Sequence, residues 1–275
     1  MIEVNLLLPL SLFVVIALSI SSYRKVGKRL KEAFGDKKIS IREAIIMVIF
    51  MGILVVVISL IPDYAIQILF IAALSYSLFI FTYLFLRRIL ISVIPPMIFT
   101  ITFLLLNYFL MDNILAVILI TNIFSATFAI IITTLIGPLF SWRVIIAFAA
   151  LLTAMDIIHV FITGYMVEAA GRAIRLGLPL MFLLPRLPSM RGVMVLGLGD
   201  VFLSGLFSIQ MTSKYSPRAG LLTAALISMV FLVFDIIVSN FIQYAGAFPA
   251  TLLVLLGWFL GMIPHILKRK EKKVA

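Results

Sequence analysis

The 275-residue sequence contains no cysteine, only two histidines and only 11 acidic residues. The missing thiols exclude disulfide bonds, cysteine nucleophiles and cysteine-ligated metal sites. His159 and His265 are the two histidines, and they cannot form the His-Glu-x-x-His pattern of a zinc protease, so we expect no metal and no cofactor. Charged residues make up 12% of the chain, and no segment is polar enough to form a separate water-soluble domain.

Long apolar runs fill the rest of the chain, of which 64% is hydrophobic. A helix needs about 20 mostly apolar residues to cross a bilayer, and prolines, glycines and charge clusters divide the sequence into nine such spans. They lie near residues 4–22, 44–61, 64–86, 89–110, 114–136, 142–164, 191–211, 219–243 and 248–267. We therefore expect an all-α, polytopic membrane protein with nine transmembrane helices.

These spans define one integral membrane domain over residues 1–275. Helices one to six occupy residues 1–164, an extramembrane connector covers 165–190, and helices seven to nine occupy 191–275. The first apolar run has no basic region ahead of it, so we expect a retained span and not a cleaved signal peptide.

The positive charges predict the orientation of these helices. Eighteen of the 22 Lys and Arg residues fall on one side, and the other side has only Arg172, Arg175, Arg186 and Arg191. The positive-inside rule then places the N-terminus outside and the C-terminus in the cytoplasm. The net charge of +11 is explained by this asymmetry and by attraction to the anionic headgroups of the lipid bilayer. Since the basic residues lack a recognisable reader fold, we expect no nucleic-acid partner.

Three acidic residues, Asp156, Asp200 and Asp235, lie well inside predicted spans. A charge near the bilayer centre costs several kcal/mol, so each is a candidate functional residue. Asp156 precedes the outer end of its span by eight residues, and Asp200 follows the outer start of the next span by nine. Antiparallel neighbouring helices would bring both to the same depth, about 12–14 Å below the surface.

Two carboxyl groups that face each other in a low-dielectric site cannot both ionise cheaply, so one is expected to keep a proton while the other acts as a base. This is the arrangement that aspartic proteases need, because the base activates water and the acid protonates the scissile carbonyl. Gly197 and Gly199 precede Asp200 and permit close approach of another helix or of a substrate backbone.

Three motifs in this order resemble those of the presenilin and signal peptide peptidase family of intramembrane aspartyl proteases. That family has an aspartate in span six, Gly-x-Gly-Asp in span seven and Pro-Ala-Leu at the start of span nine. The matching residues of this chain are Asp156, then Gly197, Leu198, Gly199 and Asp200, then Pro249, Ala250 and Thr251. Because the order and the nine-span layout agree, the resemblance covers essentially the whole chain.

The resemblance implies an aspartic endopeptidase that cleaves peptide bonds within transmembrane helices or signal peptides, with Asp156 and Asp200 as general acid and general base. The Gly-Leu-Gly and Pro-Ala-Thr segments would lie beside the substrate, and residues 188–195 would pair with an unwound substrate as a strand. The predicted orientation matches signal peptide peptidases, which implies substrates whose N-terminus is cytoplasmic. The isoleucine-rich, cysteine-free composition suits an archaeal member.

Two residues depart from the family pattern. Met155 stands where the family usually has Tyr before the first aspartate, and Thr251 stands where Leu is usual in the last motif. The first change concerns the positioning or protonation of Asp156, and the second leaves the role of the Pro-Ala-Thr turn open. Neither change removes a catalytic group.

Other functions remain open at this stage. A proton- or cation-coupled transporter would use the buried groups Asp156, His159, Asp200 and Asp235 along a pathway. An inactive scaffold protein could have the same fold. The presence of both aspartates argues against this alternative, because an inactive protein would not need them. A rhomboid-like pair of Ser204 and His159 lacks the glycine that should precede the serine. For His159 we expect a structural hydrogen-bonding role in preference to a proton relay. We expect Asp235 to be an interhelical hydrogen-bonding group.

Overall fold

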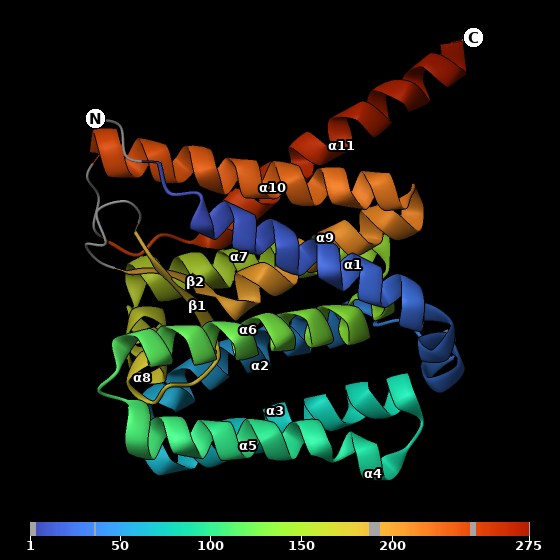
Figure 1. The fold of residues 1–275 in the computed structure, drawn as a ribbon. Helices are drawn as coiled ribbons and strands as arrows, with labels where there is room; N and C mark the ends of the chain where they lie inside the picture. The colour runs from blue at the N-terminus through green and yellow to red at the C-terminus, as the bar shows by residue number, and fades with distance from the viewer. Residues whose placement is uncertain (1–3, 36, 187–192, 243–245, 275) are drawn as a thin grey trace.

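The computed structural model describes residues 4–35, 37–186, 193–242 and 246–274, and the protein is mostly helical, at 83%. Within these ranges seven helices are long and apolar enough to cross a membrane, which agrees with the expected class of helical membrane protein. Figure 1 shows their arrangement. Six of them are a single helix or a helix continued by a short π-helical or 3-10 turn, and the fourth joins two α-helices and a π-helical turn. They are α1 (Leu7–Phe34), α2 (Ile41–Leu60), α3 (Asp63–Leu86), α4 to η1 (Ile89–Ser92, Ile94–Leu105, Leu106–Leu110), α6 with η2 (Ile114–Ile136, Gly137–Leu139), α7 with η3 (Trp142–Ile157, Ile158–Ile162) and α10 with η4 (Pro217–Ile237, Val238–Ile242).

Three further helices are shorter or only partly apolar: α8 (Tyr165–Arg175), α9 (Leu198–Lys214) and α11 (Ala250–Val274), whose apolar part is Ala250–Ile266. Helices dominate because a backbone surrounded by lipid must satisfy its own hydrogen bonds. Local signals set their starts. Ser40 and Glu43 form a capping box at α2, and Ser216 caps α10 just before Pro217.

Helix α9 lies at the centre of the molecule, and all of its side chains from Val201 to Met211 are buried. It packs against α1, α6, α10 and α11. Small residues permit close packing here: a Cβ atom on Gly205 of α9 would collide with Thr133 of α6. In the same way, a Cβ atom on Gly257 of α11 would collide with the backbone of Ile227 in the neighbouring helix α10. The central helix is thus surrounded by other helices on several sides.

A two-stranded antiparallel sheet interrupts the helices between α8 and α9. Strand β1 (Met181–Pro185) pairs with β2 (Val193–Gly197), so that Leu183 is opposite Val195. The purely all-α expectation is therefore wrong at this point, and α9 begins at Leu198 instead of at 191. The nine-span prediction treats the apolar run before Asp200 as helix, but its β-branched valines form a strand. The first two residues of the predicted span, 191 and 192, lie outside the described residues.

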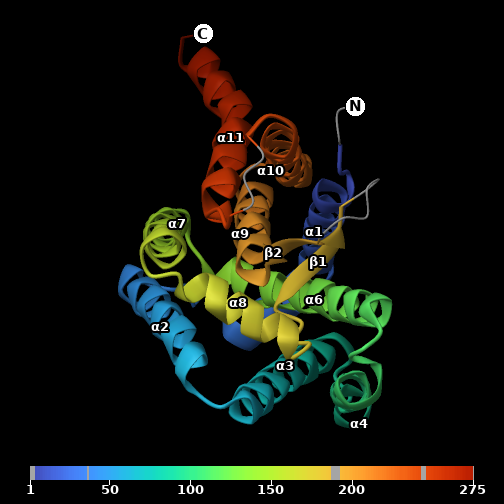
Figure 2. The same ribbon diagram turned by 90° about the vertical axis from the view of Figure 1, so that its left-hand side faces the viewer.

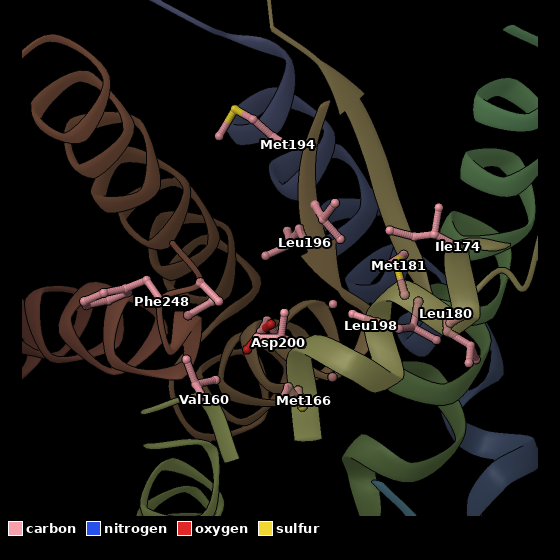
Figure 3. A pocket seen from close by; sticks show the side chains of 18 of the residues that line it. Val160, Met166, Ile174, Leu180, Met181, Met194, Leu196, Leu198, Asp200 and Phe248 are labelled. Atoms are coloured by element: carbon pink, nitrogen blue, oxygen red, sulfur yellow. The ribbon is translucent and has the colours of Figure 1, made fainter. Parts of the chain in front are cut away.

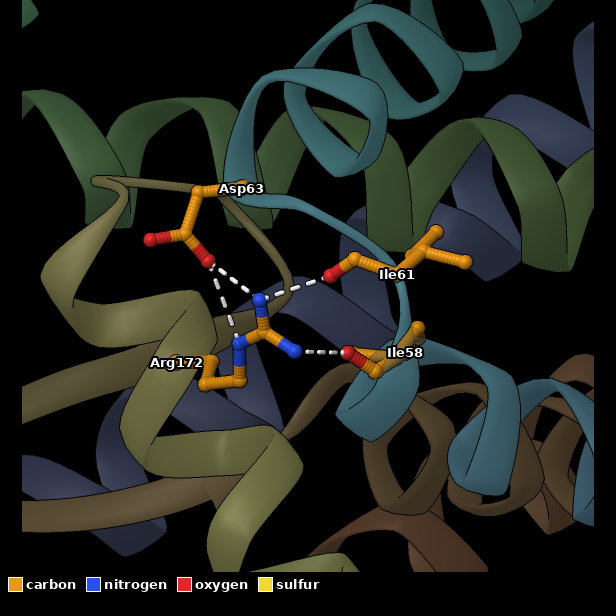
Figure 4. A network of polar contacts seen from close by, with 4 residues as sticks. All are labelled: Ile58, Ile61, Asp63 and Arg172. Carbon is orange, nitrogen blue, oxygen red and sulfur yellow. Dashed lines mark hydrogen bonds and ion pairs between the residues drawn. The ribbon is translucent and has the colours of Figure 1, made fainter.

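The hairpin and α8 lie at the same end of the bundle as the start of α1, as both views show (Figures 1 and 2). Helix α8 packs against α2 and is fixed there by Arg172. The Arg172 guanidinium donates hydrogen bonds to the carbonyl oxygens of Ile58 at 2.5 Å and Ile61 at 2.8 Å, and forms an ion pair with Asp63 at the start of α3 (Figure 4). Arg172 therefore caps the carboxyl end of α2, where backbone carbonyls lack helical partners.

This contact gives a first prediction. We expect Arg172→Met to lower the free energy of unfolding by about 1–3 kcal/mol, because charge-assisted bonds are lost and carbonyls near the α2 terminus become unsatisfied. Amide hydrogen exchange, measured by mass spectrometry, should become faster in α8 and at the α2–α3 junction. Arg175→Met is the matched control, because Arg175 is exposed on the same helix, and it should change stability by less than about 0.5 kcal/mol. Equal exchange in the two variants would contradict the assigned role of Arg172.

Candidate active site

A cavity of about 680 Å³ opens between the hairpin, α8, the carboxyl ends of α7 and α10, and the segment before α11. Its walls are mostly apolar, and the Asp200 carboxyl group lies among Leu196, Val160 and Phe248 (Figure 3). Asp156 and Asp235 line the same cavity. The structure thus brings together carboxyl groups from α7, α9 and α10, all of which the sequence singled out.

Asp156 lies in the last turn of α7, directly before the π-helical turn η3, and only 8% of its surface is exposed. The Thr251 hydroxyl donates a hydrogen bond of 2.9 Å to Asp156 Oδ2, and the backbone N–H of Thr251 faces the same carboxyl group. Met155, the residue that departs from the family pattern, packs over Gly52 of α2, where a Cβ atom would collide with it. Met155 therefore helps to fix α7 against α2 and does not enter the cavity wall.

Asp200 lies in the first turn of α9, immediately after the end of β2. The prediction that Asp200 lies nine residues inside a helix is therefore wrong. Asp200 lines the cavity because β2 ends there and leads directly into the start of α9. A Cβ atom on Gly197 would lie 3.1 Å from Asp200 Oδ2, so a larger residue there would press on that carboxyl group. Gly199 has no neighbouring atom within 4 Å of such a Cβ position, so it leaves open space beside Asp200. Leu198, between these glycines, also lines the cavity.

The two aspartates interact electrostatically across the cavity. No described backbone or side-chain group donates a hydrogen bond to the Asp200 carboxyl group, whereas Asp156 receives one from Thr251. The two carboxyl groups of the candidate pair thus have different surroundings.

The Pro-Ala-Thr motif forms the start of α11. Pro249 is buried and its carbonyl oxygen accepts a bond from Leu252 N at 3.2 Å, Ala250 begins the helix, and Thr251 is 3% exposed. The sequence left the role of Thr251 open. Its contact with Asp156 joins residues that are 95 positions apart, so no local pattern in the sequence could have revealed it.

The hairpin has one edge that is already occupied. Asn122 of α6 accepts a hydrogen bond from Leu183 N and donates one to Leu183 O, both at 2.7 Å, and Ser125 donates to Met181 O at 2.7 Å. Since the backbone of Leu183 points toward α6, the opposite residue, Val195, must direct its own N–H and C=O away from β1. Among the described residues none bonds to that outer edge of β2, which lies beside the cavity.

Three other buried polar residues have different positions. Asp235 lines the cavity, and it also accepts a hydrogen bond of 3.1 Å from Ser239 on its own helix. His159 is buried beside Asp156 but is not part of the cavity wall, and its Nδ1 is 3.3 Å from Thr163 Oγ1. Ser204 is fully buried and donates to the carbonyl oxygen of Asp200, so its hydroxyl is not placed as a nucleophile.

Throughout the described ranges, no group of three or more histidine, cysteine, aspartate or glutamate side chains is arranged to hold a metal ion. Among the residues that the structure describes, the charged side chains that line the cavity are Asp156, Asp200, Asp235 and Arg186. Neither a scan against protein-family models nor a search of curated proteins gives a match. The function of this chain is consequently inferred from the geometry of its own side chains.

Proposed function

We propose that this protein is an intramembrane aspartyl protease, similar to the presenilin and signal peptide peptidase family, that hydrolyses peptide bonds within transmembrane helices or signal peptides. The observation that supports this most directly is the meeting of Asp156 and Asp200, carried by different helices, in one apolar cavity beside an open strand edge. A carboxyl pair supplies an acid and a base, and the open edge supplies a place for an unwound substrate.

The reaction needs only the two carboxyl groups and water. The ionised aspartate takes a proton from water, the resulting hydroxide adds to the scissile carbonyl carbon, and the protonated aspartate gives its proton to the carbonyl oxygen. The first aspartate then passes its new proton to the amide nitrogen, while the second recovers a proton from a hydroxyl of the tetrahedral intermediate. The C–N bond breaks, one water is consumed, and both aspartates return to their starting states.

The proposed membrane layout has nine spans, with α9 and the apolar part of α11 added to the seven longer helices. Helix α9 is short, but it is surrounded by other helices, so it does not need the length of a lipid-exposed span. The first helix starts and the last helix ends at opposite ends of the bundle in Figure 1, which agrees with an odd number of spans. From the charge asymmetry we infer that the hairpin end lies outside and the C-terminus in the cytoplasm.

This orientation defines the substrate class that we propose, namely single spans and remnant signal peptides whose N-terminus is cytoplasmic. Accessibility of tags at the two termini in sealed vesicles tests the orientation directly. A cytoplasmic N-terminus in that experiment would reverse the proposed substrate direction.

An unwound substrate would add to β2 as a further strand. The N–H and C=O groups of Val195 point to the free edge, and Asp200 follows β2 by only a few residues in the chain. A strand bound there would present its backbone beside the carboxyl pair, and local unwinding is needed because a helical peptide bond is shielded from water.

The test of the function is cleavage of a purified type II signal-peptide reporter in detergent, with product masses determined by mass spectrometry. We expect cuts within the apolar segment of the reporter, and a mock preparation from cells without the protein serves as the control. If several reporters stay intact while the protein is folded, and sealed vesicles show acid-driven transport, the transporter interpretation of the buried carboxyl groups replaces the protease.

A further inference from the structure

The two aspartates of the cavity have different hydrogen-bonding environments, and this difference bears on which of them holds the proton. Asp156 Oδ2 accepts the Thr251 hydroxyl at 2.9 Å, and Thr251 is 3% exposed, so water does not compete for this bond. In the described part of the chain no corresponding donor reaches the Asp200 carboxyl group. Hydrogen bonds donated to a carboxylate stabilise its charged form, and they do so most strongly in a buried site.

Helix ends do not distinguish the two residues. Asp156 faces the amino end of α11 through Thr251, and Asp200 lies in the first turn of its own helix, so both experience the positive end of a helix dipole. Thr251 is therefore the residue that separates them, and its hydroxyl is the donor that a side-chain substitution removes while the backbone N–H stays in place.

We propose that Thr251 is a positioning residue that holds Asp156 as the ionised base of the pair, which leaves Asp200 as the protonated acid. This inference rests on the proposed protease function for its kinetic test, but the protonation of Asp156 is measurable without any cleavage. It also gives a role to the Pro-Ala-Thr turn: Pro249 and the start of α11 bring a hydroxyl group to the base.

The neighbouring titratable groups have to be considered in any pH experiment. Asp200 on α9, Asp235 on α10 and Arg186 after β1 line the cavity with Asp156, and His159 follows Asp156 on its own helix. Their charges act on Asp156 in every Thr251 variant alike. A comparison between variants at this one position therefore isolates the hydroxyl group.

The experiment compares wild type with Thr251→Val, which has a similar shape but no hydroxyl, and Thr251→Ser, which keeps the hydroxyl. For Thr251→Val we expect the acid limb of the pH profile of kcat to move to higher pH by about one to two units, with the alkaline limb and KM unchanged. Thr251→Ser should behave as wild type. A displaced alkaline limb would overturn the assignment, because it would make Asp156 the protonated acid. An acid limb displaced to lower pH, or no displacement of either limb, would also overturn it, because the Thr251 hydroxyl would then not stabilise the ionised form of Asp156.

A second measurement is independent of proteolysis. Infrared titration of the purified protein follows the carbonyl band of protonated carboxyl groups, and we expect Thr251→Val to take up a proton at higher pH than wild type or Thr251→Ser. The difference should vanish when Asp156→Asn is present in both proteins. A difference that persists without Asp156 would refute the proposal, whereas absence of cleavage together with the expected titration would leave it intact and count only against the protease function.

Discussion

Asp200→Asn and Asp156→Asn should each reduce reporter cleavage by about 10²–10⁴-fold, the range that general acid–base groups contribute. Asparagine has nearly the same shape as aspartate, so the cavity walls are kept, but it can neither take a proton from water nor give one to the carbonyl oxygen. Initial cleavage rates under single-turnover conditions measure the loss. Thermal unfolding should stay at or above the wild-type temperature, because replacing a buried ionisable group removes a desolvation cost.

Asp235→Asn is the matched control for these variants. Asp235 lines the same cavity, is 7% exposed against 8% for Asp156, and lies inside one of the seven long apolar helices, so its replacement tests the effect of removing any buried carboxyl group here. We expect Asp235→Asn to keep activity within about 10-fold of wild type, a smaller loss than general acid–base catalysis would give. An equally large loss would contradict a two-aspartate site, and full activity of Asp200→Asn would contradict the protease mechanism.

Much of the helical framework follows from apolar runs divided by charges and prolines. The predicted spans 89–110, 114–136 and 142–164 agree closely with the observed helices, because polar residues, glycine or proline mark each boundary. The prediction that the first span ends at 22 fails for the helix itself, since α1 continues to Phe34 through a basic stretch. Apolar length marks where a helix leaves the lipid, but a helix formed by straight-chain basic residues continues into water.

The candidate site was only partly predictable. Asp156 and Asp200 stand out in the sequence because lipid makes isolated carboxyl groups costly, and the structure does place them in one cavity. The argument from matched depth was wrong, since Val193–Gly197 is a strand, and an apolar run of that length fits a strand or a helix equally well. The contact between Thr251 and Asp156 depends on how α11 packs against α7, which no local pattern encodes.

The free edge of β2 leads to the second prediction, that Val195→Pro lowers kcat/KM by at least about 10-fold. Val195 N–H points away from β1, so proline removes a donor from the outer edge, and its ring obstructs an added strand, while the β1–β2 ladder keeps its bonds. Proline is tolerated at strand edges, and its restriction of Met194 to an extended backbone matches the strand conformation that Met194 already has. Loss of one backbone hydrogen bond to the substrate weakens binding by about 0.5–1.5 kcal/mol, and the steric obstruction by the proline ring weakens it further.

Val195→Ala is the control, because alanine trims the exposed side chain and keeps the N–H donor. Substrate binding is measured separately in the inactive Asp200→Asn background, by fluorescence anisotropy of a labelled signal-peptide reporter. Since the strand edge acts in binding and the carboxyl pair acts in chemistry, Val195→Pro should weaken binding in that background and Val195→Ala should not. If both variants bind and cleave alike, the substrate does not pair with β2, and the cavity must admit it along another wall.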